Sequence, residues 1–308
     1  MISRRIIRVK VMQTLYSMES QENLISSADA LKTLRKHLDQ SRQTLIFFTH
    51  FITEVARYAE TDARNKASKY IPSAKDLQIN TKIAGNELLW KILEHPSYIQ
   101  ALKEDKPHLI NEEDLTKRIY TELVASDRYK QYIDVQSRDR RDEKDILEFI
   151  LTELMLPNEH FIGFIEERFP NWDDDADMVN NLMSGILAKP ASLNLQELIG
   201  PEKMLFANEL LRTTVDKKEL ALDYIRPKLK NWEPDRIALL DMILMRMGVC
   251  EFLFFETIPP KVTINEYIDL AKDYSTQQSG QFINGILDSI HKDLLRDDKM
   301  HKVSFKQP

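Results

Sequence analysis

A cluster of basic residues at the start of the chain offers the clearest binding chemistry in the sequence. Four cations and no acidic residue lie within residues 1–18: Arg4, Arg5, Arg8 and Lys10. This segment carries a charge of +4, whereas the rest of the chain carries −10 and the whole chain −6. If Ser3 caps a helix, Arg4 and Arg5 lie in its first turn, where the helix dipole disfavours each cation by about 0.3–1 kcal/mol. Stability alone favours acidic residues there, so this placement suggests that the cations contact an anion.

The same segment has the periodicity of an amphipathic helix. Its apolar stripe recurs at helical spacing: Ile7, Val11, Leu15 and Met18. The helical wheel places Arg5, Gln13 and Tyr16 opposite this stripe, and Arg8 at the edge of the stripe. Guanidinium groups bind phosphates, an amide binds base edges and an aromatic ring stacks on bases, a combination that suits single-stranded RNA. A solvated basic helix end is the alternative that the composition leaves open.

The sequence lacks the residue spacings of the common catalytic and cofactor sites. It has no Gly-x-Gly for a dinucleotide, and none of its seven histidines pairs at i, i+4 for zinc. Gly280 and Gly285 have the spacing of a P-loop, but Ile286 and Leu287 follow where that loop requires Lys and Ser or Thr. The single cysteine, Cys250, lies in the most apolar segment, so we expect a buried thiol. We therefore predict a protein that is not an enzyme and has neither metal nor cofactor.

The elements that position these residues are expected to be helices throughout. Every periodic segment has the helical period, and no run of alternating residues indicates a strand. We expect helices at about residues 3–20, 27–63, 84–104, 112–126, 141–155, 159–168, 176–187, 203–217, 218–230 and 237–255. Two further helices are expected to begin with capping boxes at 263–266 and 275–278. The predicted fold class is all-α.

The most apolar segment, Ile237–Phe255, is expected to be a central buried helix rather than a membrane span. On a helix, Asp241, Arg246 and Glu251 point in three different directions, so no continuous apolar face remains. With 30% charged residues, a mean hydropathy of −0.41 and one cysteine, the composition indicates a cytoplasmic protein without a membrane contact. The N-terminus lacks the apolar region of a secretory signal, and a mitochondrial presequence is the alternative there.

Four segments, in order along the chain, resemble the NusB family of bacterial transcription antitermination factors. Residues 3–17, from the arginine-rich start through QTLYS, resemble the family's first helix with its QALYS-like string. Residues 246–252 (RMGVCEF) resemble the family's RIALYEL helix. Residues 258–272 (IPPKVTINEYIDLAK) resemble VPYKVAINEAIELAK, and residues 281–288 (QFINGILD) resemble KFVNGVLD. Each motif is modest by itself, but their order is specific.

This resemblance implies a NusB-like helical bundle that recognises boxA-type single-stranded RNA. The family does so together with NusE, a small-subunit ribosomal protein, in antitermination complexes that act on RNA polymerase. Its RNA contacts come from the arginine-rich helix and from the turn before the last helix. From the helix face and from this resemblance, the predicted RNA-binding residues are Arg4, Arg5, Arg8, Gln13, Tyr16, Tyr274, Gln278, Ser279 and Phe282. The predicted partner-binding residues are Asp241 and Arg246.

The chain departs from the family in length and at single positions. Family members are about half as long, so we expect a bundle enlarged by a long helical insertion. The predicted parts are a basic helix (1–24), an expanded helical region without an assigned role (25–200), a C-terminal core (201–296) and a polar tail (297–308). Ile6 and Ile7 stand where relatives have basic or small residues, and Gln278 and Gly280 stand where relatives have an acid and His.

Three functions follow from these features. The first is an RNA-binding antitermination factor. The second is a helical protein-interaction adaptor of NusB fold that has lost RNA binding, which the long acidic central region favours. The third is an RNA-modifying enzyme, because NusB-like domains also occur fused to RNA methyltransferases. The absence of a glycine-rich cofactor loop from the sequence argues against the third.

Overall fold

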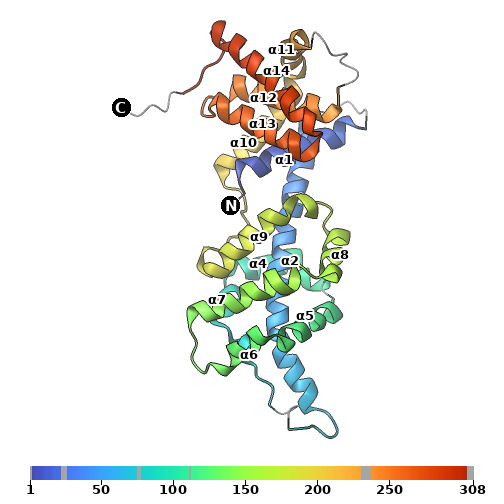
Figure 1. Cartoon of the computed structure of the whole chain (residues 1–308), viewed down its shortest axis with the longest axis vertical. Helices are drawn as coiled ribbons and strands as arrows, with labels where there is room; N and C mark the ends of the chain where they lie inside the picture. Colours follow the sequence, from blue (N-terminus) through green and yellow to red (C-terminus); the bar gives the residue numbers. More distant parts are fainter. Residues whose placement is uncertain (1, 22–25, 75–77, 111, 230–236, 304–308) are drawn as a thin grey trace, which may run out of the picture. The chain divides into compact units, whose positions relative to one another are not determined.

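The computed structural model describes residues 2–21, 26–74, 78–110, 112–229 and 237–303 (Figure 1). Every regular element within these ranges is a helix and none is a strand, which confirms the predicted all-α class. The chain divides into two compact units. Unit 1 consists of residues 1–38 and 199–308, and unit 2 of residues 39–198. Unit 1 therefore combines both ends of the chain, and unit 2 is a continuous insertion in the sequence.

Unit 1 is built around one apolar helix. Its helices are α1 (Arg4–Glu19), α10 (Pro201–Asp216), α11 (Lys218–Ile225), α12 (Leu239–Phe254), α13 (Pro260–Tyr274) and α14 (Gln277–Arg296). The other five all pack on α12 (Figure 1). Residues 243–252 of α12 are buried. This confirms the predicted central buried helix. Among the described residues, no helix combines the length and the apolar character needed to cross a membrane.

Two small residues of α12 fit this central position. A Cβ atom at Gly248 would lie 2.9 Å from both methyl carbons of Leu287, so α12 and α14 approach closely there. Cys250 is buried, and its Sγ lies 3.6 Å from the carbonyl oxygen of Thr213. Burial raises the pKa of this thiol to about 12. The prediction of a buried thiol is confirmed.

The starts of α13 and α14 correct two predictions. α13 begins at Pro260 and not with a capping box at Thr263, because a proline at the first helical position needs no N–H partner. Thr263 instead donates its hydroxyl proton to Glu251 inside the unit, at 2.8 Å. α14 does begin with a capping box, but Thr276 is the N-cap and Ser279 the reciprocal member, one residue later than predicted.

The chain after α14 returns to the C-terminal end of α12. Lys302 donates hydrogen bonds to the carbonyl oxygens of Glu251 and Phe255, and the amide of Val303 donates to Glu256. The bond to Glu251 satisfies a carbonyl in the last turn of α12, where a helix end leaves carbonyls without an intrahelical partner. Burial lowers the pKa of Lys302 to about 8. Of the predicted polar tail, residues 304–308 lie outside the described residues.

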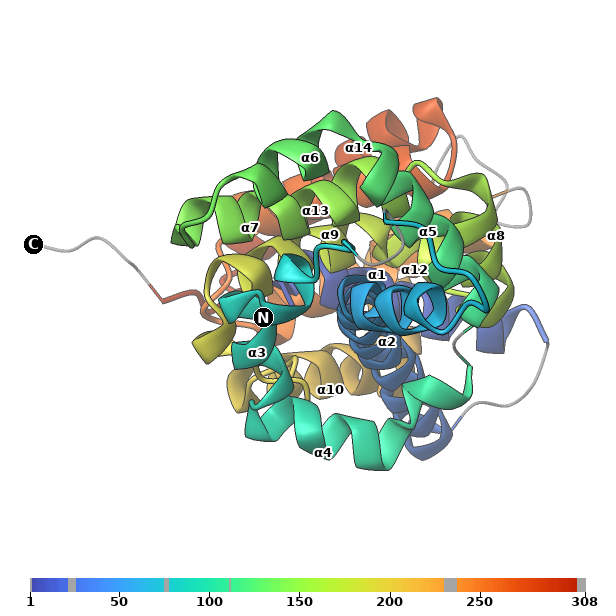
Figure 2. The same cartoon turned by 90° about the horizontal axis from the view of Figure 1, so that it is seen from below.

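Unit 2 is arranged around the long helix α2 (Ser27–Ala67), which begins in unit 1. Seven shorter helices surround α2 (Figure 2): α3 (Glu87–Leu93), α4 (Pro96–Asp105), α5 (Glu113–Ala125), α6 (Asp127–Asp134), α7 (Arg140–Phe149), α8 (Glu159–Arg168) and α9 (Trp172–Ala188). Aromatic side chains join α2 to this layer. Phe48 stacks on Trp172 with ring centroids 5.0 Å apart, and Phe51 lies 4.8 Å from Phe161. Residues 45–48 and 51–53 of α2 are all buried, as expected for a helix covered on every side.

Three helices of unit 2 differ from the sequence predictions. The predicted helix at 84–104 is broken before Pro96, where His95 caps a new helix by accepting the amide of Ser97 at 3.2 Å. α6 was not predicted, and its N-cap is Ser126. The predicted helix at 141–155 continues beyond α7 as a π-helical turn, Ile150–Met155.

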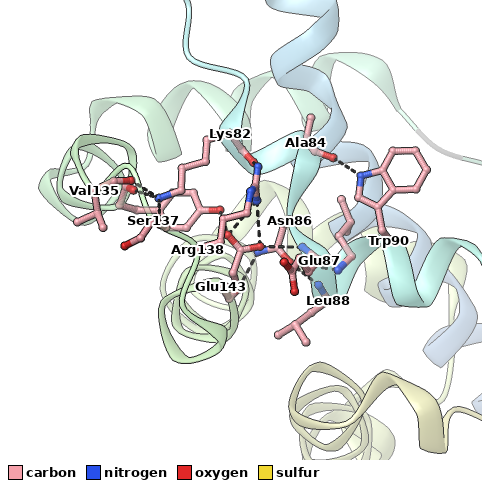
Figure 3. A network of polar contacts seen from close by, with 12 residues as sticks. Lys82, Ala84, Asn86, Glu87, Leu88, Trp90, Val135, Ser137, Arg138 and Glu143 are labelled. Atoms are coloured by element: carbon pink, nitrogen blue, oxygen red, sulfur yellow. Dashed lines mark hydrogen bonds and ion pairs between the residues drawn. The ribbon is translucent and has the colours of Figure 1, made fainter.

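A buried polar network fixes the connection between α6 and α7 (Figure 3). The carboxylate of Glu143 accepts hydrogen bonds from the Tyr132 hydroxyl at 2.8 Å, from Arg138 at 3.0 Å and from the amide of Glu87 at 2.7 Å. The ammonium group of Lys82 donates to three carbonyl oxygens of this connection, those of residues 132, 135 and 137. Because these partners satisfy the buried charge of Glu143 and the free carbonyls, we interpret the network as structural.

His50 of α2 is a buried histidine that couples the stability of unit 2 to pH. It is 6% exposed, and its Nδ1 lies 3.2 Å from the hydroxyl of Tyr98. Burial, aided by the nearby charges of His108 and Arg57, lowers the pKa of His50 from 6.5 to about 4. The neutral ring is therefore the form that fits this site.

Unit 2 is expected to lose stability as the pH falls from 6.5 toward 4. In this window the unfolded chain binds the proton of His50 more strongly than the folded chain, which costs about 2–3 kcal/mol near pH 4.5. Urea unfolding followed by tryptophan fluorescence measures the loss, since two of the three tryptophans, Trp90 and Trp172, belong to unit 2. A His50→Gln variant should lose less than the wild type over this window, whereas a variant of the exposed residue His160 (His160→Gln) should lose as much. An equal loss in all three proteins would contradict the assignment.

Candidate nucleic-acid interface

α1 starts where the sequence predicts. The side chain of Ser3 caps the helix by accepting the amide of Ile6 at 3.3 Å, so Arg4 and Arg5 lie in the first turn. Ile7 and Leu15 of the apolar stripe are fully buried. The N-cap therefore fixes the positions of the two arginines at the start of α1.

Arg8 lies inside unit 1, with only 2% of its surface exposed. It donates two hydrogen bonds to the carboxylate of Glu251, at 3.0 and 2.8 Å, and its Nη1 lies 3.2 Å from Glu266. Glu251 is fully buried and also accepts the hydroxyl groups of Thr263 and Tyr267. Burial lowers the pKa of Arg8, but the hydrogen bonds and charge of Glu251 outweigh this and raise it above its ordinary value. Arg8 holds α1 against α12 and α13, so we leave it out of the RNA surface.

Arg4 and Arg5 reach the surface, with 38% and 40% of their side chains exposed. Arg4 forms an ion pair with Glu202 in the first turn of α10. Arg5 donates to Asp273 on the last turn of α13 at 2.7 Å and lies 3.9 Å from Asp269. The start of α1 is thereby placed beside the turn between α13 and α14, although the sequence separates Arg5 from Asp273 by 268 residues.

The turn between α13 and α14 carries four of the predicted contacts. Gln278 is exposed, and Tyr274 and Phe282 are half-buried. Ser279 is buried, and its hydroxyl donates to Asp241 at 2.8 Å. A ligand at this turn can therefore reach Tyr274, Gln278 and Phe282, whereas Ser279 is enclosed.

Gln13 and Tyr16 lie farther along α1. Gln13 is half-buried, and Tyr16 is 46% exposed. At 1.5 Å per residue, Tyr16 lies about 16 Å along the helix axis from Arg5. The structure brings Arg5 to the turn but does not bring Tyr16 to Arg5. An RNA strand that contacts both residues has to run along α1.

The two predicted partner-binding residues are enclosed. Asp241 is 6% exposed and accepts the hydroxyl proton of Ser279. Arg246 is 1% exposed and forms an ion pair with Glu19, which also pairs with Lys218 at 3.2 Å. Both side chains thus connect helices of unit 1, and neither offers an exposed charge to a partner protein.

The charge of the chain divides unevenly between the two units. Unit 1 has 23 basic and 20 acidic residues, a net charge of +3. Unit 2 has 20 basic and 29 acidic residues, a net charge of −9. The acidic excess of the chain therefore belongs to unit 2, and the unit that contains Arg4 and Arg5 has the sign that attracts nucleic acid.

Sequence reasoning missed the carboxylates at the surface arginines: Glu202, Asp269 and Asp273. The one available signal is the i, i+4 spacing of Asp269 and Asp273, which puts both on the same face of α13. No sequence pattern indicates that this face meets α1. An incoming phosphate group must displace these carboxylates from Arg4 and Arg5.

Comparison with known proteins finds a family similarity in the C-terminal part of the chain. The sequence model of the NusB family matches residues 172–292, which begin at α9 and end within α14. α1 lies outside this match. No solved structure matched the chain.

Three bacterial relatives named transcription antitermination protein NusB match shorter stretches. The protein of Salinibacter ruber is 43% identical over 102 residues, which are 33% of this chain and 64% of the relative. That of Methylacidiphilum infernorum is 45% identical over 83 residues, 27% of this chain and 58% of the relative. That of Chloroherpeton thalassium is 43% identical over 79 residues, 26% of this chain and 37% of the relative. The chain spans less than two thirds of each relative. The chain is thus similar to the NusB family over residues 172–292, which include the end of unit 2 and most of the C-terminal part of unit 1.

Proposed function

We propose that this chain is an RNA-binding transcription antitermination factor that binds boxA-type single-stranded RNA together with NusE. One observation carries the proposal. Arg5 on α1 donates a hydrogen bond to Asp273 in the last turn of α13, so the start of the basic helix lies beside the turn before the last helix. The match to the NusB family over residues 172–292 and the positive charge of unit 1 support it.

The proposed surface combines two kinds of contact. Arg4 and Arg5 bind phosphate groups, which replace the carboxylates now paired with them. Tyr274 and Phe282 at the turn, and Tyr16 along α1, offer aromatic faces on which unstacked bases stack. Gln278 and Gln13 offer amide groups for base edges. The protein works as a scaffold in this account, and RNA polymerase responds to the assembled complex.

The pairing of the arginines favours a second candidate function, a protein-interaction adaptor of NusB fold without RNA binding. Arg4, Arg5 and Arg8 all have carboxylate partners within unit 1. An exposed arginine that already has a carboxylate partner gains less from a phosphate than an unpaired one, because one charge pair replaces another. The acidic unit 2 would then be the surface for a protein partner.

Fluorescence anisotropy with the full chain separates the two functions. We expect the chain to bind a labelled boxA-like RNA more tightly than a scrambled RNA of the same composition, and NusE to strengthen the binding to boxA-like RNA. This result is expected because base contacts at the turn carry sequence information, whereas phosphate contacts do not. Equal binding of both RNAs would exclude the proposed recognition of boxA-type RNA. Binding of NusE without binding of either RNA would exclude the proposed function and favour the adaptor.

A further inference from the structure

Ser279 is the centre of a buried hydrogen-bond cluster at the base of the α13–α14 turn. Its Oγ lies 2.8 Å from Oδ2 of Asp241, 2.9 Å from Oγ1 of Thr276 and 3.0 Å from Oγ of Ser275. It also accepts the amide of Thr276 at 3.4 Å, while Thr276 accepts the amide of Ser279 at 3.2 Å. Side chains from α12, the turn and α14 therefore meet at one hydroxyl group.

The direction of the hydrogen bonds follows from the chemistry of these groups. A carboxylate oxygen only accepts, so the single proton of the Ser279 hydroxyl points to Asp241. The two lone pairs of Ser279 Oγ then accept from the turn, which offers the hydroxyl groups of Thr276 and Ser275 and the amide of Thr276. Without the carboxylate, the Ser279 proton could point to either neighbour instead, and the N-cap of α14 would lose its single arrangement.

Asp241 is the member of this cluster that comes from another helix. It lies in the first turn of α12, 38 residues before Ser279, and is 6% exposed. Capping boxes usually use the long side chains of Glu or Gln at the third helical position, which reach the N-cap amide unaided. Serine is shorter, and here its hydroxyl is oriented by a carboxylate on α12. The turn therefore takes its conformation partly from α12.

We propose that Asp241 is a positioning residue for RNA binding. It holds the α13–α14 turn, through Ser279, in the conformation that presents Tyr274 and Gln278, and it does not itself touch RNA. This inference rests on the proposed function, because it assigns a role within the same surface. A turn that has to be ordered on binding costs conformational entropy, so a turn held in advance binds more tightly.

Amide hydrogen exchange of the turn, measured without RNA, tests the first half of this proposal. Asp241→Ala is expected to raise the exchange rate of the amides of residues 276–280 by about tenfold, because a charge-assisted hydrogen bond no longer orders the cap. Asp241→Asn retains a carbonyl oxygen that accepts from Ser279, so it should restore most of the protection. The matched control is Asp288→Ala, which removes an exposed carboxylate of α14 that pairs with Lys292.

RNA affinity over a range of salt concentrations tests the second half. Asp241→Ala should weaken binding by about three- to tenfold without changing the slope of log K against log salt, because no cation is lost. Adding Ser279→Ala to Asp241→Ala should weaken binding little further, because both changes remove the same hydrogen bond. Asp288→Ala should leave affinity and exchange unchanged.

Three results would overturn the positioning role: unchanged exchange in Asp241→Ala, the same change in Asp288→Ala, or losses that add in the double variant. The proposed function has its own failure, which is a wild-type chain that does not bind boxA-like RNA at all. In that case the proposed role of Asp241 in RNA binding is excluded as well. The exchange data then report only whether Asp241 orders the turn. A fall in the salt slope of Asp241→Ala would mean that the variant had disturbed the arginines.

Discussion

Replacing Arg8 with methionine is expected to lower the free energy of unfolding of unit 1 by about 3–5 kcal/mol. The change removes two hydrogen bonds to Glu251 and leaves that fully buried carboxylate with only the hydroxyl groups of Thr263 and Tyr267. An uncompensated charge in a dry interior costs far more than the lost contact itself. Urea unfolding, combined with hydrogen exchange of α12, measures the effect in unit 1.

A second variant separates the destabilisation caused by the unpaired buried charge from that caused by the lost side-chain volume. Arg8→Met combined with Glu251→Leu removes both charges, so the double variant should be clearly more stable than Arg8→Met alone. Arg8→Lys should still be destabilised, because an ammonium group cannot form the paired hydrogen bonds of a guanidinium. An Arg8→Met protein as stable as the wild type would contradict the buried ion pair.

Replacing Arg4 and Arg5 together with alanine is expected to weaken RNA binding by about tenfold or more while the fold stays intact. Both arginines are about 40% exposed, and surface ion pairs contribute only about 0–1 kcal/mol each to stability. Each guanidinium is expected to bind one phosphate in the complex, and hydrogen bonds to charged groups are worth about 1.5–3 kcal/mol. Asp273→Asn should act in the opposite direction, because it removes the carboxylate that competes with RNA for Arg5.

The matched control is a double alanine variant of Arg212 and Arg296. These arginines also belong to unit 1, are 60% and 70% exposed, and also pair with carboxylates. They lie about 15 Å along α10 from Glu202 and about 26 Å along α14 from Ser279, at 1.5 Å per residue. The control loses the same net charge, so a similar loss of RNA affinity in both double variants would indicate general electrostatic attraction and not this surface.

Features that depend on local periodicity could be predicted from the sequence. The Ser3 cap, the first-turn arginines and the buried stripe of α1 follow from spacing and residue type within one helix. The burial of α12 follows in the same way, because its apolar residues occupy all faces of the helix and not one face only.

The location of Arg8 could not be predicted, because its partner lies 243 residues away. A helical wheel gives the direction of Arg8 relative to the apolar stripe, but not which helices cover that direction. α1 is also covered by the first turns of α2, where His37 lies 3.1 Å from Thr14. A helical wheel predicts one buried face for α1. In the structure, helices on several sides bury the middle of α1, which includes Lys10.

The ion pairs of the charged side chains could not be predicted from the sequence either. Arg5 looked available from the wheel, but whether a surface cation faces solvent or a carboxylate depends on which helix packs beside it. Asp241 and Arg246 are a similar case. The family resemblance implied that both bind a partner protein, and the structure instead places them in contacts with Ser279 and Glu19 inside unit 1.

The salt dependence of RNA binding tests the central claim most directly, which is that the start of α1 binds the RNA backbone. The slope of log K against log salt, measured between about 50 and 200 mM salt, falls by about 0.7 for each phosphate contact with a single strand. We predict that Arg4→Ala with Arg5→Ala makes the slope for boxA-like RNA shallower by about 1.4 relative to the wild type. The same affinity and the same slope in the wild type and in this double variant would contradict the claim.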